Sequence, residues 1–91
     1  MVEIIWDEKF KRIYKKWSYK HPDLVNSFLQ TLKLFENDPF HPSIKTHSLS
    51  GILKGQWSLR ISYEHRLVFK FLDKGKKKVL LIDIGTHEEV Y

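Results

Sequence analysis

The sequence contains no cysteine, no long apolar run and little proline or glycine. Without cysteine, the chain cannot form disulfides, use a thiolate nucleophile or build a cysteine-ligated zinc site. Its longest apolar run, residues 79–82, is far too short to cross a bilayer, and its start does not resemble a signal peptide. No internal repeat, low-complexity tract or linker composition is present. We therefore expect a single cytoplasmic domain spanning residues 1–91.

The sequence is rich in apolar and basic residues. Hydrophobic residues make up 42% and aromatic residues 14% of the 91 positions, which is enough for a packed core. Sixteen Lys and Arg against eleven Asp and Glu give a formal net charge of +5. A small basic domain attracts polyanions, so nucleic acid or an acidic protein is the expected partner. The short apolar runs argue against a membrane partner.

The first half of the chain has the periodicity of one strand and two helices. Residues 2–6 form a short β-branched apolar segment, and Asp7 occupies the position of a helix N-cap. Apolar residues then recur at helical spacing at Phe10, Ile13, Tyr14 and Trp17. His21 and Pro22 interrupt this helix and begin a second one, which ends near residue 37. Its apolar stripe is Leu24, Val25, Phe28, Leu29, Leu32 and Phe35.

The second half has the pattern of a sheet. Residues 39–55 are predicted to be mainly loop with one short strand, and residues 57–63 and 66–71 alternate between apolar and polar. Residues 79–84 are apolar on both faces apart from Asp83, which is typical of a central strand, and residues 86–91 form a tail. The predicted fold is α+β, with an N-terminal strand and a helical hairpin packed on one face of an antiparallel sheet of four to five strands. The residues expected in its core are Phe10, Ile13, Trp17, Phe28, Leu32, Leu59, Ile61, Leu67 and Phe69.

Arg60 and Arg66 are predicted to lie on the sheet face that points away from the helices. If their strands pair in a hairpin that turns at residues 63–65, the two guanidinium groups are neighbours, and an anion between them relieves their repulsion. Arginine suits phosphate binding because its planar fork binds two oxygens and stays charged. The alternative is a solvated sheet face on which one arginine pairs with Glu64.

RNA can be cut without a metal or cofactor when a base takes the proton of the ribose 2′-OH and an acid protonates the leaving 5′-oxygen. His47 in the loop and His87 after the last strand are candidates, because imidazole titrates near neutral pH. Lys45 and Lys54 could bind phosphates and Tyr91 could stack on a base, although each of these residues could equally be an ordinary surface or edge residue. No pair of histidines has the spacing of metal ligands, so no metal or cofactor is predicted.

Three motifs in the second half resemble those of a known toxin family. Residues 57–69, W-S-L-R-I-S-Y-E-H-R-L-V-F, resemble the W-S-x-R-I-x-x-E-H-R-L-V-Y/F segment of the YoeB toxins. Residues 45–55, K-T-H-S-L-S-G-I-L-K-G, resemble the D-H-x-L-x-G-x-x-K-G loop of the YafQ toxins. Residues 85–91, G-T-H-E-E-V-Y, are similar to the YafQ ending G-T-H-x-x-L-F. The chain thus resembles the RelE/ParE superfamily of type II toxin–antitoxin toxins.

The resemblance implies a RelE-like fold, ribosome-dependent endoribonuclease activity on mRNA in the ribosomal A site, and a cognate antitoxin. The loop and terminal histidines of the family fall on His47 and His87, and its phosphate-binding arginines fall on Arg60 and Arg66. The residues expected in catalysis are His47, Glu64, His87, Arg60 and Arg66, and those expected to bind RNA are Lys45, Lys54, Arg60, Arg66 and Tyr91.

The chain departs from both family patterns at the residues that would act as the catalytic base. The middle-strand histidine of YafQ falls on Arg60 and the following aspartate falls near Glu64, whereas the loop glutamate of YoeB aligns with Ser43. The base is therefore His47 or Glu64, with His47 preferred and His87 as the acid. Two alternatives to an active toxin stay open: a RelE-fold protein with weak or no nuclease activity that binds an antitoxin, and a basic nucleic-acid-binding domain without chemistry.

Overall fold

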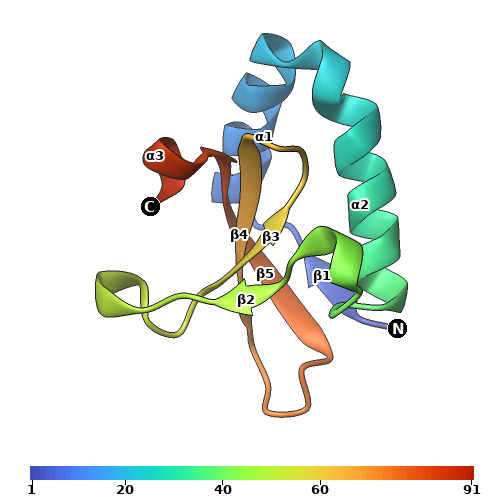
Figure 1. Ribbon diagram of the computed structural model, residues 1–91, viewed down its shortest axis with the longest axis vertical. Coiled ribbons are helices and arrows are strands. Elements are labelled where there is room, and N and C mark those ends of the chain that lie inside the picture. The colour runs from blue at the N-terminus through green and yellow to red at the C-terminus, as the bar shows by residue number, and fades with distance from the viewer.

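The computed structural model, which describes residues 1–91, begins with a short strand and a helical hairpin (Figure 1). Strand β1 spans Glu3–Ile5, and the Asp7 side chain caps helix α1 (Glu8–Lys20) by accepting a hydrogen bond from the Phe10 N–H at 2.8 Å. A 3-10 turn at Pro22–Leu24 separates α1 from helix α2 (Val25–Asn37). The N-cap and the break at His21 are therefore as the sequence predicted. None of the helices is both long enough and apolar enough to cross a membrane.

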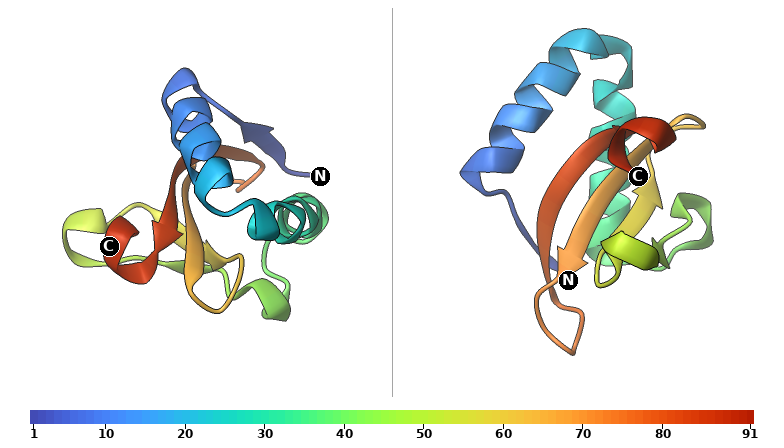
Figure 2. Two further views of the ribbon diagram at one scale, coloured as in Figure 1. Left: turned by 90° about the horizontal axis from the view of Figure 1, so that it is seen from above. Right: turned by 90° about the vertical axis from the view of Figure 1, so that its left-hand side faces the viewer.

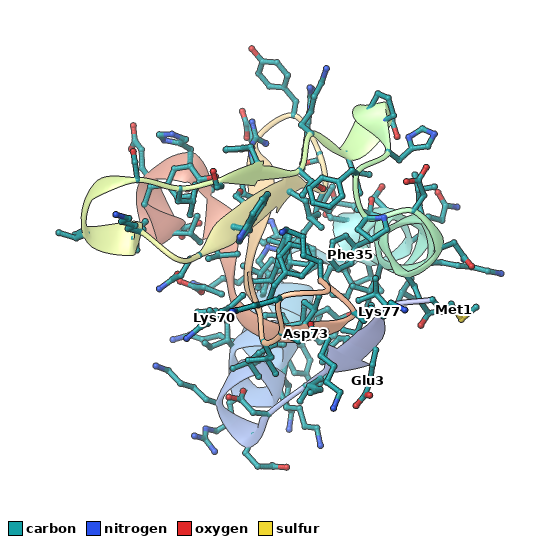
Figure 3. The ribbon with its side chains drawn as sticks, turned by 90° about the horizontal axis from the view of Figure 1, so that it is seen from below. Met1, Glu3, Phe35, Lys70, Asp73 and Lys77 are labelled. Carbon is teal, nitrogen blue, oxygen red and sulfur yellow. The ribbon has the colours of Figure 1, made fainter.

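The second half supplies four strands and a short terminal helix. After a 3-10 turn at Pro42–Ile44 come strand β2 (His47–Ser48), a 3-10 turn at Gly51–Leu53 and strand β3 (Trp57–Arg60). Strands β4 (His65–Phe71) and β5 (Lys78–Thr86) follow, and helix α3 (His87–Val90) ends the chain. Between β4 and β5, the carboxylate of Asp73 accepts hydrogen bonds from the backbone N–H groups of Lys77 and Lys78, and Figure 3 shows Asp73 in this turn.

The sheet has five strands in the order β1-β5-β4-β3-β2. Neighbouring strands from β2 to β5 pair antiparallel, but β1 pairs parallel with β5, and Ile4 lies opposite Val79. The sheet is therefore mixed, and the prediction of an antiparallel sheet was wrong for β1. Alternation along a strand indicates which side chains share a face and carries no information about strand direction, which the path of the helical hairpin decides here.

The core lies between the helical hairpin and one face of the sheet (Figure 2). Seven of the residues predicted for the core are buried in it: Phe10, Trp17, Phe28, Leu59, Ile61, Leu67 and Phe69. Ile13 and Leu32 pack against this core as partly buried residues. Phe35, labelled in Figure 3, is buried on α2, and its ring contacts that of Phe69 on β4. Leu29, which the helical periodicity placed in the apolar stripe, is 51% exposed. The periodicity therefore predicted the core well, except that it included the exposed residue Leu29 in the apolar stripe of α2.

Two features of the C-terminal third were not predicted. The pairing of β4 with β5 shifts between Val68 and Phe69, so that Val68 lies opposite Asp83 and Phe69 lies opposite Leu81. This bulge lets both Leu81 and Ile84 enter the core although three positions separate them. Burial raises the pKa of Asp83, and a hydrogen bond from the Ile84 N–H to its carboxylate opposes that rise. Residues 87–90 are helical, whereas the sequence predicted only a tail.

Candidate functional site

The face of the sheet opposite the helices holds the two predicted arginines. Arg60 on β3 lies directly opposite Arg66 on β4, and both side chains are half-buried. Adjacent Leu59 and Leu67 also lie opposite each other and are buried in the core, so alternation points both arginines away from it. Two like charges facing each other across a ladder destabilise it, and a bound anion would relieve this repulsion. The arrangement predicted for the arginines is therefore present.

Arg66 is held by the turn that joins β3 to β4. Its Nη1 atom donates hydrogen bonds to the carbonyl oxygens of Ser62, Tyr63 and His65 at 3.0, 3.1 and 3.2 Å. The guanidinium carbon of Arg60 lies 5.3 Å from the ring centroid of Tyr63. Neither arginine pairs with a carboxylate, because the one ion pair in the structure joins Lys11 to Glu8. The alternative of an arginine paired with Glu64 is therefore wrong.

Helix α3 brings His87 to the edge of the same face. The Thr86 side chain accepts a hydrogen bond from the Glu89 N–H, and the Glu89 carboxylate accepts one from the Thr86 N–H. These bonds form a capping box, and the hydrogen bonds that the Glu89 carboxylate accepts from Thr86 lower the pKa of Glu89. Gly85 permits the close approach of α3, because a Cβ atom there would lie 3.2 Å from Glu89 Cβ and 3.3 Å from Val90 Cγ1.

Tyr91 anchors the end of α3 to the sheet. Its hydroxyl donates a hydrogen bond to the Oγ of Ser58, which is fully buried on β3. The rings of Tyr91 and His87 are in edge-to-face contact, with centroids 4.4 Å apart. The position of the His87 ring therefore depends on Ser58 through Tyr91. Ser58 was missed by the sequence reasoning, because alternation alone makes it a solvated residue.

A hollow of about 340 Å³ separates the turn between β3 and β4 from α3. It brings together three of the predicted catalytic residues, Glu64, Arg66 and His87, and its other lining residues are Tyr63, Thr86 and Glu88. We call this space the first hollow; two carboxylates, one guanidinium and one imidazole surround it. Arg60 and His47 do not line it.

His47 reaches the same sheet face from β2. It lies opposite Ser58 in the pairing of β2 with β3, so it is one strand away from the residue that anchors Tyr91. Its Nδ1 atom lies 2.8 Å from the carbonyl oxygen of Lys45. A carbonyl only accepts hydrogen bonds, so Nδ1 carries the proton in the neutral ring and Nε2 presents its lone pair. This tautomer suits a base.

The two predicted RNA-binding lysines lie in the loop around β2. Lys45 is exposed and has a positive φ of 53°, a backbone conformation that is uncommon outside glycine. Lys54 is exposed immediately after the 3-10 turn at Gly51–Leu53. Neither lines the first hollow. The structure brings no three histidine, aspartate or glutamate side chains together in a way that could hold a metal ion.

His65 is a further buried polar residue beside the site, and the sequence reasoning gave it no role. It is 6% exposed, with its ring centroid 4.6 Å from that of His21 and 5.9 Å from that of Trp17. Its Nδ1 atom lies 3.3 Å from Ser62 Oγ, whereas its Nε2 atom has no partner. Burial lowers the pKa of His65, and repulsion by His21 lowers it further. His65 therefore supports, from the helical side, the turn that holds Arg66.

Comparison with known proteins places this arrangement in a family. The chain matches the family described as "Bacterial toxin of type II toxin-antitoxin system, YafQ" over residues 2–91. Toxin YoeB from Escherichia coli strain K12 is 32% identical over 72 residues, which cover 79% of this chain and 86% of YoeB.

Solved structures share the fold. YafQ from E. coli strain BL21(DE3) matches with a TM-score of 0.78 and 22% identity, and the match covers 100% of this chain and 99% of the YafQ chain. The heterotetrameric YoeB-YefM toxin-antitoxin complex from Staphylococcus aureus has a TM-score of 0.69 and 23% identity, covering 96% of this chain and 98% of the matched chain. The resemblance seen in residues 45–91 thus extends through the first half of the sequence. The chain belongs to the YafQ family of bacterial type II toxin–antitoxin toxins, within the RelE/ParE superfamily.

Proposed function

We propose that this toxin is a metal-independent endoribonuclease that cuts mRNA in the ribosomal A site. The observation that carries the proposal is the shared sheet face, on which Arg60 and Arg66 lie opposite each other and Arg66 lines one hollow with Glu64 and His87. Anion binding and proton transfer are the two requirements for cleaving RNA by attack of its own 2′-OH. Membership of the YafQ family adds support.

In the proposed reaction, His47 is the base. Its Nε2 lone pair takes the proton of the ribose 2′-OH, and the 2′-oxygen then attacks the adjacent phosphorus. Support comes from the hydrogen bond that keeps the proton on Nδ1. Glu64 is the second candidate, because it lines the hollow that contains His87 and Arg66.

His87 is the proposed acid. It donates a proton to the 5′-oxygen as the bond between phosphorus and that oxygen breaks, which leaves a 2′,3′-cyclic phosphate and a 5′-hydroxyl. Arg60 and Arg66 stabilise the negative charge that builds on the phosphate oxygens. Lys45 and Lys54, both exposed beside β2, and Tyr91 beside His87 contact the RNA on either side.

We also propose that a cognate antitoxin in the cytoplasm neutralises this chain. The net charge of +5 and the unpaired arginines of the sheet face favour an antitoxin segment with carboxylates. The YoeB-YefM structure from S. aureus is a toxin-antitoxin complex and offers a precedent within the same fold.

The test is inducible expression of the wild-type chain and of His87→Ala, with mapping of transcript ends. We expect new 5′ ends within coding regions for wild type, and a single-turnover cleavage rate on the ribosome that falls by roughly 10²–10⁴-fold for His87→Ala. RNA binding should change little, because one exposed imidazole makes a small part of the contact. His47→Gln and Glu64→Gln are measured in the same assay. The base is the residue whose substitution lowers the cleavage rate more.

Two outcomes would contradict the proposal. Intact transcripts on translating ribosomes with an excess of wild-type protein would favour the alternative, a RelE-fold module that binds antitoxin or nucleic acid without cutting. Full activity of His87→Ala would show that His87 is not the acid, but it would not contradict the proposed endoribonuclease activity.

A further inference from the structure

Tyr63 is an aromatic residue whose position the fold does not explain. It lies in the turn between β3 and β4 with 81% of its surface exposed, and it is not among the residues packed in or against the core. The guanidinium of Arg60 lies 5.3 Å from its ring centroid, and its carbonyl oxygen accepts a hydrogen bond from Arg66. The backbone and the ring of Tyr63 thus each contact one of the two arginines, while most of the ring stays open to solvent.

A second hollow lies on the other side of this turn. It has a volume of about 420 Å³ and is lined by His21, Asp23, Leu24, Ser62, Tyr63, Glu64 and His65. The first hollow, with Glu64, Arg66 and His87, also includes Tyr63 among its lining residues. Tyr63 therefore stands between two hollows, of which only the first contains an arginine.

The charges of the two hollows favour different parts of a nucleotide. Arg66 is the one lysine or arginine that lines either hollow, and its permanent charge attracts a phosphate to the first hollow, beside the carboxylates of Glu64 and Glu88. The second hollow is lined by the carboxylates of Asp23 and Glu64 and has no lysine or arginine, so it repels phosphate. Carboxylates instead accept hydrogen bonds from the amino groups of nucleobases. A flat base entering the second hollow would meet the open ring of Tyr63.

We propose that Tyr63 is a stacking platform for the nucleobase next to the scissile phosphate, and that Asp23 favours a base with an exocyclic amino group over uracil. This inference rests on the proposed nuclease function. Stacking of the base on Tyr63 positions the RNA backbone. The scissile phosphate then reaches Arg60 and Arg66, while the neighbouring base lies on the other side of the turn between β3 and β4. Tyr63 is accordingly a binding and specificity residue, with no part in proton transfer.

Single-turnover cleavage on programmed ribosomes, measured over a range of toxin concentrations, tests the platform. We expect Tyr63→Leu to raise the concentration for half-maximal cleavage roughly 5- to 100-fold, because it removes one stacked base. The maximal rate should change far less, and Tyr63→Phe should behave like wild type. Tyr19→Leu is the matched control, since Tyr19 is 78% exposed on α1 and away from both hollows.

The base preference is tested with reporter transcripts that differ in the base flanking the mapped cut. Wild type should disfavour uracil there, and Asp23→Asn should reduce that discrimination. If wild type cleaves and Tyr63→Leu matches it at every concentration, the platform is wrong and the nuclease stands. If Tyr63→Leu weakens binding but Asp23→Asn keeps the wild-type preference, the role of Asp23 is wrong. A wild-type protein that cuts nothing removes the proposed function and this inference together.

Discussion

One part of the Arg66 guanidinium holds the turn between β3 and β4, and the rest is available for the phosphate contact proposed above. One nitrogen, Nη1, donates to three carbonyl oxygens of the turn between β3 and β4, which leaves Nη2 and Nε for a ligand. Lysine cannot do both, because its ammonium is a single point of charge without a planar fork. The identity of this residue as arginine, and not only its charge, therefore matters.

We expect Arg66→Lys to lower the single-turnover cleavage rate by about 10²-fold and also to weaken RNA binding, because both the turn and the phosphate lose donors. The control is Arg12→Lys, the same substitution on the exposed surface of α1 and away from the site, which should leave the cleavage rate unchanged. A wild-type rate for Arg66→Lys would mean that charge alone is enough at this position.

His65 makes stability depend on pH. Its folded-state pKa lies below the ordinary value of 6.5, chiefly because burial disfavours the charged ring. Electrostatic repulsion by His21 also lowers the pKa of His65, whereas Glu89, Glu64 and Asp23 raise it. The unfolded chain therefore binds more protons below pH 6.5, so the contribution of His65 is complete above that pH and is lost as the pH falls.

His65→Phe should keep the ring contacts with Trp17 and His21 while removing the titrating group and its unpartnered Nε2. Urea unfolding of wild type between pH 7.5 and pH 5 should show a falling free energy of unfolding, with a shallower fall for His65→Phe. His41→Phe in the loop before β2 is the control and should follow wild type. Equal slopes for all three proteins would exclude His65 as the source.

At the scale of elements, helix α3 depends on the sheet for its existence. It spans only His87–Val90, and a helix this short is not stable by itself. The capping box between Thr86 and Glu89, the absence of a side chain at Gly85 and the bond from Tyr91 to Ser58 hold it in place. The position of His87 follows from these contacts.

Gly85→Ala should therefore displace α3 and reduce cleavage while the rest of the fold persists. The added Cβ atom would lie 3.0 Å from Glu89 Oε1 and 3.3 Å from Val90 Cγ1, and overpacking of this kind costs about 1–3 kcal/mol. Gly75→Ala is the matched control, because its Cβ atom would meet neighbours no closer than 3.4 Å. Thermal unfolding and cleavage assays on both variants check this, and wild-type activity of Gly85→Ala would show that α3 tolerates the shift.

At the scale of the whole molecule, charge and fold serve separate purposes. The helical hairpin covers one face of the sheet and builds the core (Figure 2), and the proposed site lies on the opposite face. The net charge of +5 acts over longer distances than these contacts and speeds the approach of an acidic partner.

We expect the association rate with the cognate antitoxin to fall as salt rises from about 50 to 500 mM, because mobile ions screen the attraction. The dissociation rate should change less, since close contacts dominate it. Stopped-flow mixing at several salt concentrations gives both rates. Substituting Arg60 and Arg66 with Gln should flatten the salt dependence, and an association rate that ignores salt would contradict charge steering.

The sequence by itself determined the helices, most of the core and the two faces of β3 and β4, because these depend on local periodicity. It also contains the T-x-x-E signature of a capping box at Thr86 and Glu89, which is a local signal for the start of α3.

Only the tertiary structure decided the parallel pairing of β1 with β5, the bulge at Val68, and the contacts of Ser58 and His65. These features join segments far apart in the chain, and neither spacing nor composition records which distant residues meet. Ser58 and Tyr91 are 33 residues apart, yet their hydrogen bond helps to position His87. The candidate residues could be chosen from the sequence, whereas their arrangement around one hollow required the fold.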